Sequence, residues 1–285
     1  MESDTMKALT LWKRWLGAAL AMSVVASGAG LAAGTSAADG AAAPAAAARQ
    51  DEAAEHLAAM TRYLASLPGF QVTLLGSYDA VQESGQKIEF HELRDIALAR
   101  PDRLRVRHVR SDGVESQIVF DGKTISVLSG EANVYARAPQ PGALDDAIVY
   151  FVRDLGMRLP LARLFTSRAP DEIERRVQSL VYVERTTVLP VPVHHIAGRA
   201  GNVDVQLWIA DGDRPLPLRI VLTYVDEPGQ PQFRAQFLDW RTEPPGGTDT
   251  FRFTPPPGAR QIAFAVQVPA MTDGGATRSD KGARP

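Results

Sequence analysis

The sequence predicts a mainly β fold with some α structure: one curled antiparallel sheet of roughly ten strands that forms an incomplete barrel. Three observations support this prediction. Apolar residues recur at every second position in most segments between Phe70 and Phe253, which is the period of half-buried strands. Glycine- and proline-containing turns separate those segments. Helical spacing of apolar residues is confined to the start of the fold and to one insertion in its middle.

The N-terminus is expected to be a secretory signal peptide covering residues 1–38. Lys7, Lys13 and Arg14 precede the short apolar run Trp15–Ala26, and small residues follow through Ala38. This run is too short for a membrane span, which needs about 20 strongly apolar residues. Cleavage is expected after Ala33 or Ala38, although a retained anchor is the alternative. Translation starting at Met6 in place of Met1 would leave a purely positive n-region.

Composition sets the limits of the remaining chain. Residues 39–50 are alanine-rich and are expected to form an unstructured linker, residues 51–268 the folded domain, and residues 269–285 a disordered tail. The 31 Lys and Arg against 33 Asp and Glu give a net charge of −2, which argues against a nucleic-acid binder. The chain has no cysteine, so disulfides, cysteine–metal sites and catalytic thiols are excluded.

Each element follows from its local pattern. Leu57, Met60, Leu64 and Leu67 share one face of a helix that Pro68-Gly69 ends. A second helix is expected over residues 144–155, and a short one over residues 171–177 with Pro170 at its start. Asp121-Gly122 predicts a tight hairpin. The expected strands cover residues 70–78, 88–100, 104–107, 118–120, 125–127, 180–188, 193–199, 203–210, 218–225, 233–240 and 251–253.

No motif indicates catalysis or a resident cofactor. Gly122-Lys123-Thr124 lacks the first glycine of a phosphate-binding loop and is better explained as the hairpin turn. His194 and His195 are adjacent in a predicted strand, so they point to opposite faces and cannot hold one metal ion. The sequence shows no nucleophile–base constellation, so we expect neither enzyme activity nor a metal site.

Two polar patterns leave alternatives open. Arg103, Arg105 and Arg107 form a row on one strand face, which fits either a solvated surface or transient contact with anionic lipid headgroups. Glu92 and Arg94 share the parity of the apolar positions in their strand. Either a bulge shifts the phase of the strand, or the pair points inward as an ion pair.

Three motifs resemble the LolA/LppX-like lipoprotein carriers of the bacterial cell envelope. They are Arg100-Pro101 before a strand, the hairpin 119–124, and the closing segment 251–258, which reads Phe-Arg-Phe-Thr-Pro-Pro-Pro-Gly. Within that superfamily, residues 85–88, 100–104, 211–217 and 229–233 resemble the predicted periplasmic proteins of domain of unknown function 2092. The resemblance implies a periplasmic half-barrel whose concave apolar face, closed by helices, holds acyl chains or another hydrophobic segment. It also implies that Arg100 latches the helical lid.

The preferred interpretation is a non-enzymatic periplasmic protein that carries or senses a lipid, a lipoprotein or another hydrophobic ligand, without a cofactor. A cavity of about 300–1,000 Å³ is expected. The alternative is an envelope interaction or regulatory module that recognises a partner protein through its sheet. The candidate ligand-binding residues are Val72, Leu74, Phe90, Leu98, Arg100, Val106, Ile118, Phe120 and Ile125 on the sheet, with Ile148, Phe151 and Leu155 on the lid.

Overall fold

The computed structural model describes residues 39–150, 161–188 and 191–264. The expected signal peptide and C-terminal tail therefore lie outside the described residues, as do Phe151 and Leu155 of the expected lid. Among the described residues, no helix combines the length and the hydropathy needed to cross a membrane.

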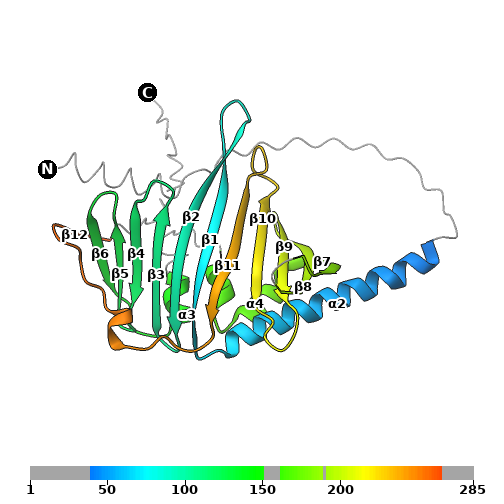
Figure 1. Cartoon of the computed structure of the whole chain (residues 1–285), viewed down its shortest axis with the longest axis horizontal. Coiled ribbons are helices and arrows are strands. Elements are labelled where there is room, and N and C mark those ends of the chain that lie inside the picture. The colour runs from blue at the N-terminus through cyan, green and yellow to red at the C-terminus, as the bar shows by residue number, and fades with distance from the viewer. Residues whose placement is uncertain (1–38, 151–160, 189–190, 265–285) are drawn as a thin grey trace, which may run out of the picture.

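One open sheet of twelve strands forms the body of the molecule (Figure 1). The strand order is β12-β6-β5-β4-β3-β2-β1-β11-β10-β9-β8-β7, so β1 joins the N-terminal and C-terminal halves of the sheet through β11. The strands are β1 (Gly69–Val81), β2 (Lys87–Ala99), β3 (Arg103–Arg110), β4 (Glu115–Phe120), β5 (Thr124–Ser129), β6 (Val134–Pro139), β7 (Val177–Thr186), β8 (Val193–Ala200), β9 (Val203–Ala210), β10 (Pro217–Tyr224), β11 (Gln232–Arg241) and β12 (Arg260–Ile262).

The predicted curled, mainly antiparallel sheet is confirmed, with two corrections at its C-terminal end. Residues 251–253 are not a strand, because the chain there leaves the short helix η3 (Thr248–Phe251) and runs through three prolines that cannot donate ladder hydrogen bonds. The last strand is instead β12, which pairs with β6 in parallel, so the sheet is mixed at this edge.

The longest helix, α2 (Asp39–Ser66), opens the fold and begins well before the expected residue 51. Residues 39–50 are therefore helical and not an unstructured linker. Alanine has the highest helix propensity of all residues. The part of α2 from Ala53 onward is packed on the sheet and supplies the nucleus from which the alanine-rich segment extends the helix. Figure 1 shows this N-terminal part projecting beyond the end of the sheet, while Leu57, Met60 and Leu64 are buried against it.

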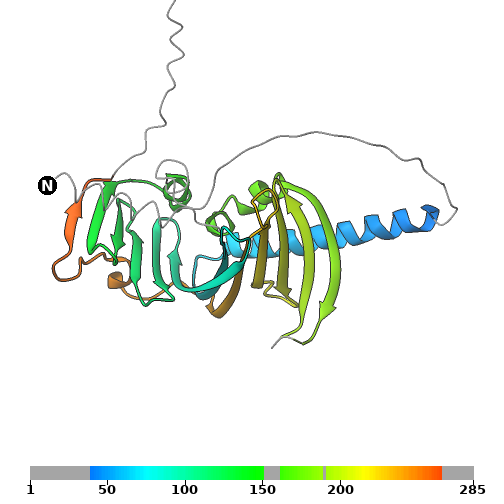
Figure 2. The ribbon, with the colours of Figure 1, turned by 90° about the horizontal axis from the view of Figure 1, so that it is seen from above.

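In the described residues between β6 and β7 there are three short helices: α3 (Leu144–Val149), η2 (Ala162–Phe165) and α4 (Ala169–Glu174). As predicted, Pro170 lies in the first turn of α4, where its missing N–H has no helical partner to lose. Figure 2 shows α3 and α4 on the same side of the curled sheet. We call the sheet face that carries Val72, Leu74 and Leu98 and packs against the helices the inner face.

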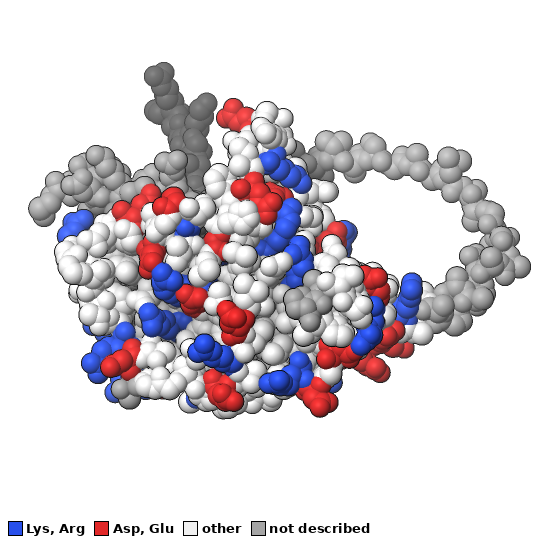
Figure 3. Space-filling model, in the orientation of Figure 1, with Lys and Arg blue, Asp and Glu red and all other residues white. Residues whose placement is uncertain are grey.

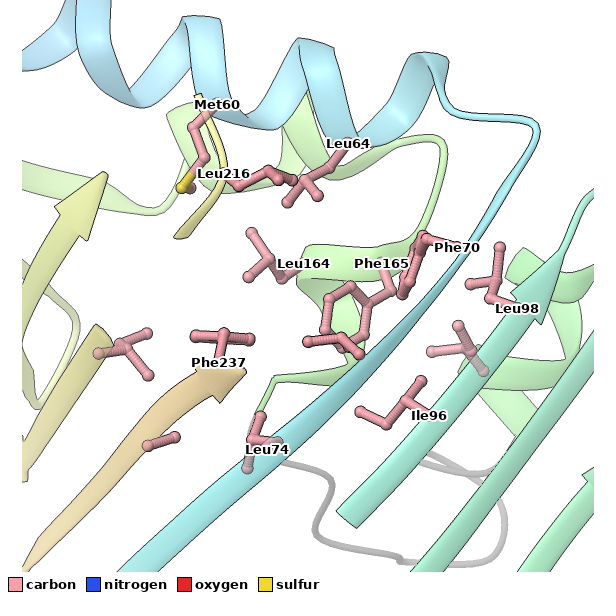
Figure 4. Close-up of a cluster of buried hydrophobic side chains, with 14 of the residues drawn as sticks. Met60, Leu64, Phe70, Leu74, Ile96, Leu98, Leu164, Phe165, Leu216 and Phe237 are labelled. Carbon is pink, nitrogen blue, oxygen red and sulfur yellow. The ribbon is translucent and has the colours of Figure 1, made fainter. Parts of the chain in front are cut away.

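The core lies between the inner face and the helices (Figure 4). Phe70 of β1 is fully buried, with ring centroids 5.2 Å from Phe165 of η2 and 5.4 Å from Trp240 of β11. Met60 and Leu64 of α2 pack into the same cluster as Leu164 and Phe237. Apolar burial of this kind is the main driving force for folding, so the core fixes how α2 and η2 lie on the sheet.

Candidate functional site

Most residues predicted to line a ligand cavity belong instead to this solid core. Val72, Leu74, Leu98, Ile118, Phe120, Ile125 and Ile148 are buried in one continuous cluster, and Val106 is half-buried against it. Leu74 and Leu98 are seen in Figure 4 among close neighbours. These side chains do point toward the inner face, as the alternation predicts. In the half of the sheet formed by β1–β5 they meet one another and the helices, and none of them lines the apolar cavity described below.

Phe90 is the exception, because 40% of its surface is exposed. It belongs neither to the buried cluster nor to the lining of the cavity described below. The β1–β2 hairpin is longer than the strands beside it and extends past them in Figure 1, so none of the described helices covers its tip. There Phe90 stacks on Tyr78, which is directly opposite it, with ring centroids 5.9 Å apart.

An apolar cavity lies in the other half of the sheet. It has a volume of about 180 Å³, below the 300–1,000 Å³ expected, and lies between α2, the η2–α4 segment and strands β7–β10. Its walls are formed by Leu57, Met60, Leu161, Arg163, Leu164, Ile173, Arg176, Val177, Leu180, residues 196–200, Val205, Leu207, Ile220 and Leu222.

Small residues in β8 explain why a hollow forms here. Ala197, Gly198 and Ala200 follow Ile196, so this stretch of β8 offers little side-chain volume to fill the space under α2. A side chain at Gly198 would collide with the carbonyl of Ser179 and with Leu180, the residue of β7 that lies directly opposite Gly198. No pattern in the sequence was interpreted as this site. The three small residues that follow Ile196 within one strand are the signal that could have indicated it.

Arg100 joins three segments at the end of β2. Its Nε donates to the carbonyl of Leu67 at 3.1 Å, and one Nη donates to those of Leu64 at 3.4 Å and Phe165 at 3.0 Å. Arginine can satisfy several helix-terminal carbonyls at once because its five N–H donors form a rigid fork. Burial lowers the pKa of Arg100, and the nearby carboxylate of Asp145 opposes that shift.

Asp145 of α3 lies near Arg100 and connects α3 to the same group of segments. Its two carboxylate oxygens accept from the backbone N–H of Ser167 at 3.0 and 3.1 Å, which ties α3 to the segment between η2 and α4. The backbone N–H of Leu144 donates to the carbonyl of Pro101 at 2.8 Å. The side chain of Arg100 therefore contacts α2 and η2, whereas α3, the expected lid helix, is held by the backbone beside it.

Glu92 and Arg94 form the inward-facing ion pair that was one of the two alternatives. The β1–β2 register is unbroken from Gly69 to Val81, so no bulge shifts the phase. Glu92 is 7% exposed and lies 2.7 Å from Arg94 and 3.0 Å from Nε2 of His108. Burial alone would raise the pKa of Glu92, but Arg94 and His108 lower it to about 2. Gly76, across the ladder, leaves room for the Glu92 side chain.

A second polar cluster connects α2 to β7 and β8 near the cavity. The ring of His56 stacks on that of His194 with centroids 3.8 Å apart. His194 also contacts the hydroxyl of Tyr182 and a carboxylate oxygen of Asp211, each at 3.1 Å. Burial, then the charge of His194, lowers the pKa of His56, while Glu52, Glu55 and Asp211 act in the opposite direction.

This lowered pKa makes stability depend on pH. As pH falls through about 6.5, the unfolded chain protonates its histidines at their ordinary pKa, whereas folded His56 resists protonation. Stability is therefore complete above that pH and decreases below it. Urea unfolding between pH 8 and 5 should show a shallower decrease for His56→Phe, which keeps an aromatic ring but cannot titrate. His91→Phe, at an exposed histidine of β2, should retain the full decrease, and an unchanged slope in His56→Phe would contradict the prediction.

Other residues singled out in the sequence lie on the outer face. His195 points away from His194 and stacks on Trp208, as the alternation predicted. Arg107 of the arginine row forms ion pairs with Asp95 and Glu115, which fits a solvated strand face. Acidic and basic groups are interspersed on the face shown in Figure 3. No cluster of metal-ligating side chains occurs within the described residues.

Several solved structures are similar to the chain at low identity. An uncharacterised conserved protein from Thermus thermophilus is 14% identical, with a TM-score of 0.43, over 71% of this chain and 94% of its own. LprF from Mycobacterium bovis is 15% identical, with a TM-score of 0.41, over 73% and 98%. A LolA superfamily protein from Nitrosomonas europaea is 12% identical, with a TM-score of 0.34, over 70% and 97%. No curated protein matches the chain.

The family comparison is more specific. The family model described as predicted periplasmic protein (DUF2092) matches residues 53–265, which covers the sheet, the helices and the cavity described above. This match confirms the family resemblance and the periplasmic location predicted from the sequence. The chain therefore belongs to the DUF2092 family of predicted periplasmic proteins.

Proposed function

We propose that this protein is a non-enzymatic binding protein of the periplasm that carries or senses a hydrophobic ligand, such as a lipid or the acyl chain of a lipoprotein. The cavity beneath α2 is the observation that carries the proposal. Its lining is almost entirely apolar, and ligand sites are typically apolar hollows with a few polar groups at fixed places. LolA-like and LprF structures among the similar folds are consistent with this class of function.

The position of the cavity suits reversible binding. One wall is α2, which contributes Leu57 and Met60 and is connected to the sheet end through Arg100. A second wall is the η2–α4 segment, which Arg100 also contacts at Phe165. A small displacement of either segment would widen the hollow without breaking the β ladder. We therefore assign Arg100 a positioning role: it holds the two covering segments together and does not itself contact the ligand.

Filling the cavity should abolish binding. Ala200 lines it from β8, so Ala200→Phe adds an aromatic ring inside the hollow without removing a core side chain. A fluorescent fatty-acid probe should bind the parent and bind Ala200→Phe at least about tenfold more weakly, a loss of about 1.4 kcal/mol. Ala54→Phe, at an exposed position of α2, is the matched control and should bind like the parent. Equal binding by both variants, each with native circular dichroism, would refute this site.

Partner recognition is the second candidate, and one observation favours it. Tyr78, Ile88 and Phe90 are each about 40% exposed near the tip of the β1–β2 hairpin, where exposed apolar groups cluster. Native mass spectrometry of protein purified from an envelope fraction separates the two candidates. A co-purifying lipid supports the carrier proposal, whereas a stoichiometric protein that Phe90→Ser releases supports the interaction module.

A further inference from the structure

The mouth of the cavity carries charged groups that the walls lack. Arg163 of η2 and Arg176, between α4 and β7, both line the cavity and are both exposed, so they lie where it opens to solvent. Arg163 is held by Glu172, with Nη1 and Oε2 3.0 Å apart. Arg176 has no carboxylate partner within the described part of the chain. Arg199 also lines the cavity, but its guanidinium pairs with Asp204 at 2.7 Å.

The interior of the cavity, unlike its mouth, is apolar. Apart from these arginines, every side chain that lines the cavity is apolar, or absent as at Gly198. An apolar cavity of about 150 Å³ in another protein accepts one benzene molecule, so a volume near 180 Å³ that opens to solvent suits one hydrocarbon chain of no more than medium length. A ligand with two or three long chains would exceed this space. The hollow therefore fits a single chain. The guanidinium of Arg176, which has no carboxylate partner among the described residues, fits an anion at the mouth.

We propose that the cavity binds a single-chain anionic amphiphile of the medium-chain carboxylate class. The hydrocarbon chain lies under α2, and the carboxylate accepts hydrogen bonds from Arg176. Arginine donates to a carboxylate through two parallel N–H groups, which fixes the head group at the opening. Arg163 contributes little to carboxylate binding because its guanidinium already donates a hydrogen bond to Glu172. This inference rests on the proposed function, since it names the ligand class of the same cavity.

Calorimetric titration with decanoate, decanol and decyltrimethylammonium, each below its micellar concentration, tests the proposal. Decanoate should bind the parent at least about tenfold more tightly than decanol, because its carboxylate accepts charge-assisted hydrogen bonds from Arg176 and the hydroxyl of decanol carries no charge. Decyltrimethylammonium should bind most weakly. Arg176→Gln should bind decanoate and decanol equally, with its affinity for decanol unchanged. Arg175→Gln is the matched control, since Nε of Arg175 donates to the carbonyl of Asp171 in its own helix, and should retain the preference.

The outcomes separate this inference from the proposed function. If none of the three amphiphiles binds the parent, the hydrophobic-carrier proposal itself is overturned. If decanoate and decanol bind the parent equally, the cavity binds apolar chains and the anionic preference is wrong. If the preference survives in Arg176→Gln, the assignment to Arg176 is wrong. Loss of the preference in Arg176→Gln alone supports the inference.

Discussion

Replacing Glu92 with glutamine is expected to lower the free energy of unfolding by about 3 kcal/mol or more at neutral pH. The carboxylate of Glu92 is the charge partner of Arg94 and a hydrogen-bond partner of His108, both turned toward the inner face. A neutral amide leaves the Arg94 guanidinium without its counter-charge in a poorly solvated place. Removing one partner of a buried pair is far more costly than never having built the pair.

The pH dependence identifies the cause. The pKa of folded Glu92 is about 2, below the 4.5 of the unfolded chain, so its contribution is complete above that value and is lost as pH falls toward 2. The difference between parent and Glu92→Gln in urea unfolding should therefore shrink over this range. Glu89→Gln, at an exposed position of the same strand, should cost less than about 0.5 kcal/mol. A destabilisation in Glu92→Gln that does not change with pH would contradict the electrostatic explanation.

Replacing Arg100 with leucine is also expected to have a large effect, lowering the free energy of unfolding by about 2–4 kcal/mol. The variant removes three hydrogen bonds and leaves the carbonyls of Leu64, Leu67 and Phe165 without the guanidinium. The sheet itself should persist because its ladders do not involve this side chain. Amide exchange should rise where α2 ends and in η2, while exchange in β4 and β5 stays as in the parent.

Arg103→Leu is the control for this experiment. Arg103 begins the next strand and contacts Asp102 and the carbonyl of Asp121 on the exposed surface, without reaching either helix. Its exchange pattern should match that of the parent. If Arg100→Leu also leaves exchange unchanged at α2 and η2, Arg100 has no positioning role. Faster exchange confined to α3 would instead support the lid latch implied by the LolA-like resemblance.

Local patterns predicted most elements and the sides of the sheet, but not strands β6 and β12. Alternation placed Val72, Leu74 and Phe120 on the buried face, and helical spacing identified the face of α2 that carries Leu57, Met60 and Leu64. These predictions succeed because the period of a strand or a helix is set by its own backbone. Alternation did not predict that Phe90 is exposed. Exposure depends on where the neighbouring strands and helices end, and no local pattern contains that information.

The ion pair of Glu92 and Arg94 in β2 shows more clearly what a local pattern cannot decide. Its spacing left two alternatives, a bulge or an inward ion pair. The unbroken register with β1, the absence of a side chain at Gly76 and the presence of His108 on β3 decided between them. Two of these three determinants lie on other strands. A buried charge is tolerated only when its partners are assembled around it, so the outcome depends on tertiary contacts.

The sequence by itself determined the class of fold, the family and the direction in which each strand faces, because these follow from periodicity, turn chemistry and short motifs. The tertiary structure alone decided where a cavity remains. The pairing of β1 with β11 joins segments more than 150 residues apart and brings β7–β10 beneath α2. Over β1–β5 the inner-face side chains form one buried cluster with those of α3 and η2, whereas the small side chains of β8 leave space in the other half. Volume left over between distant segments is a property of their packing, which no single segment encodes.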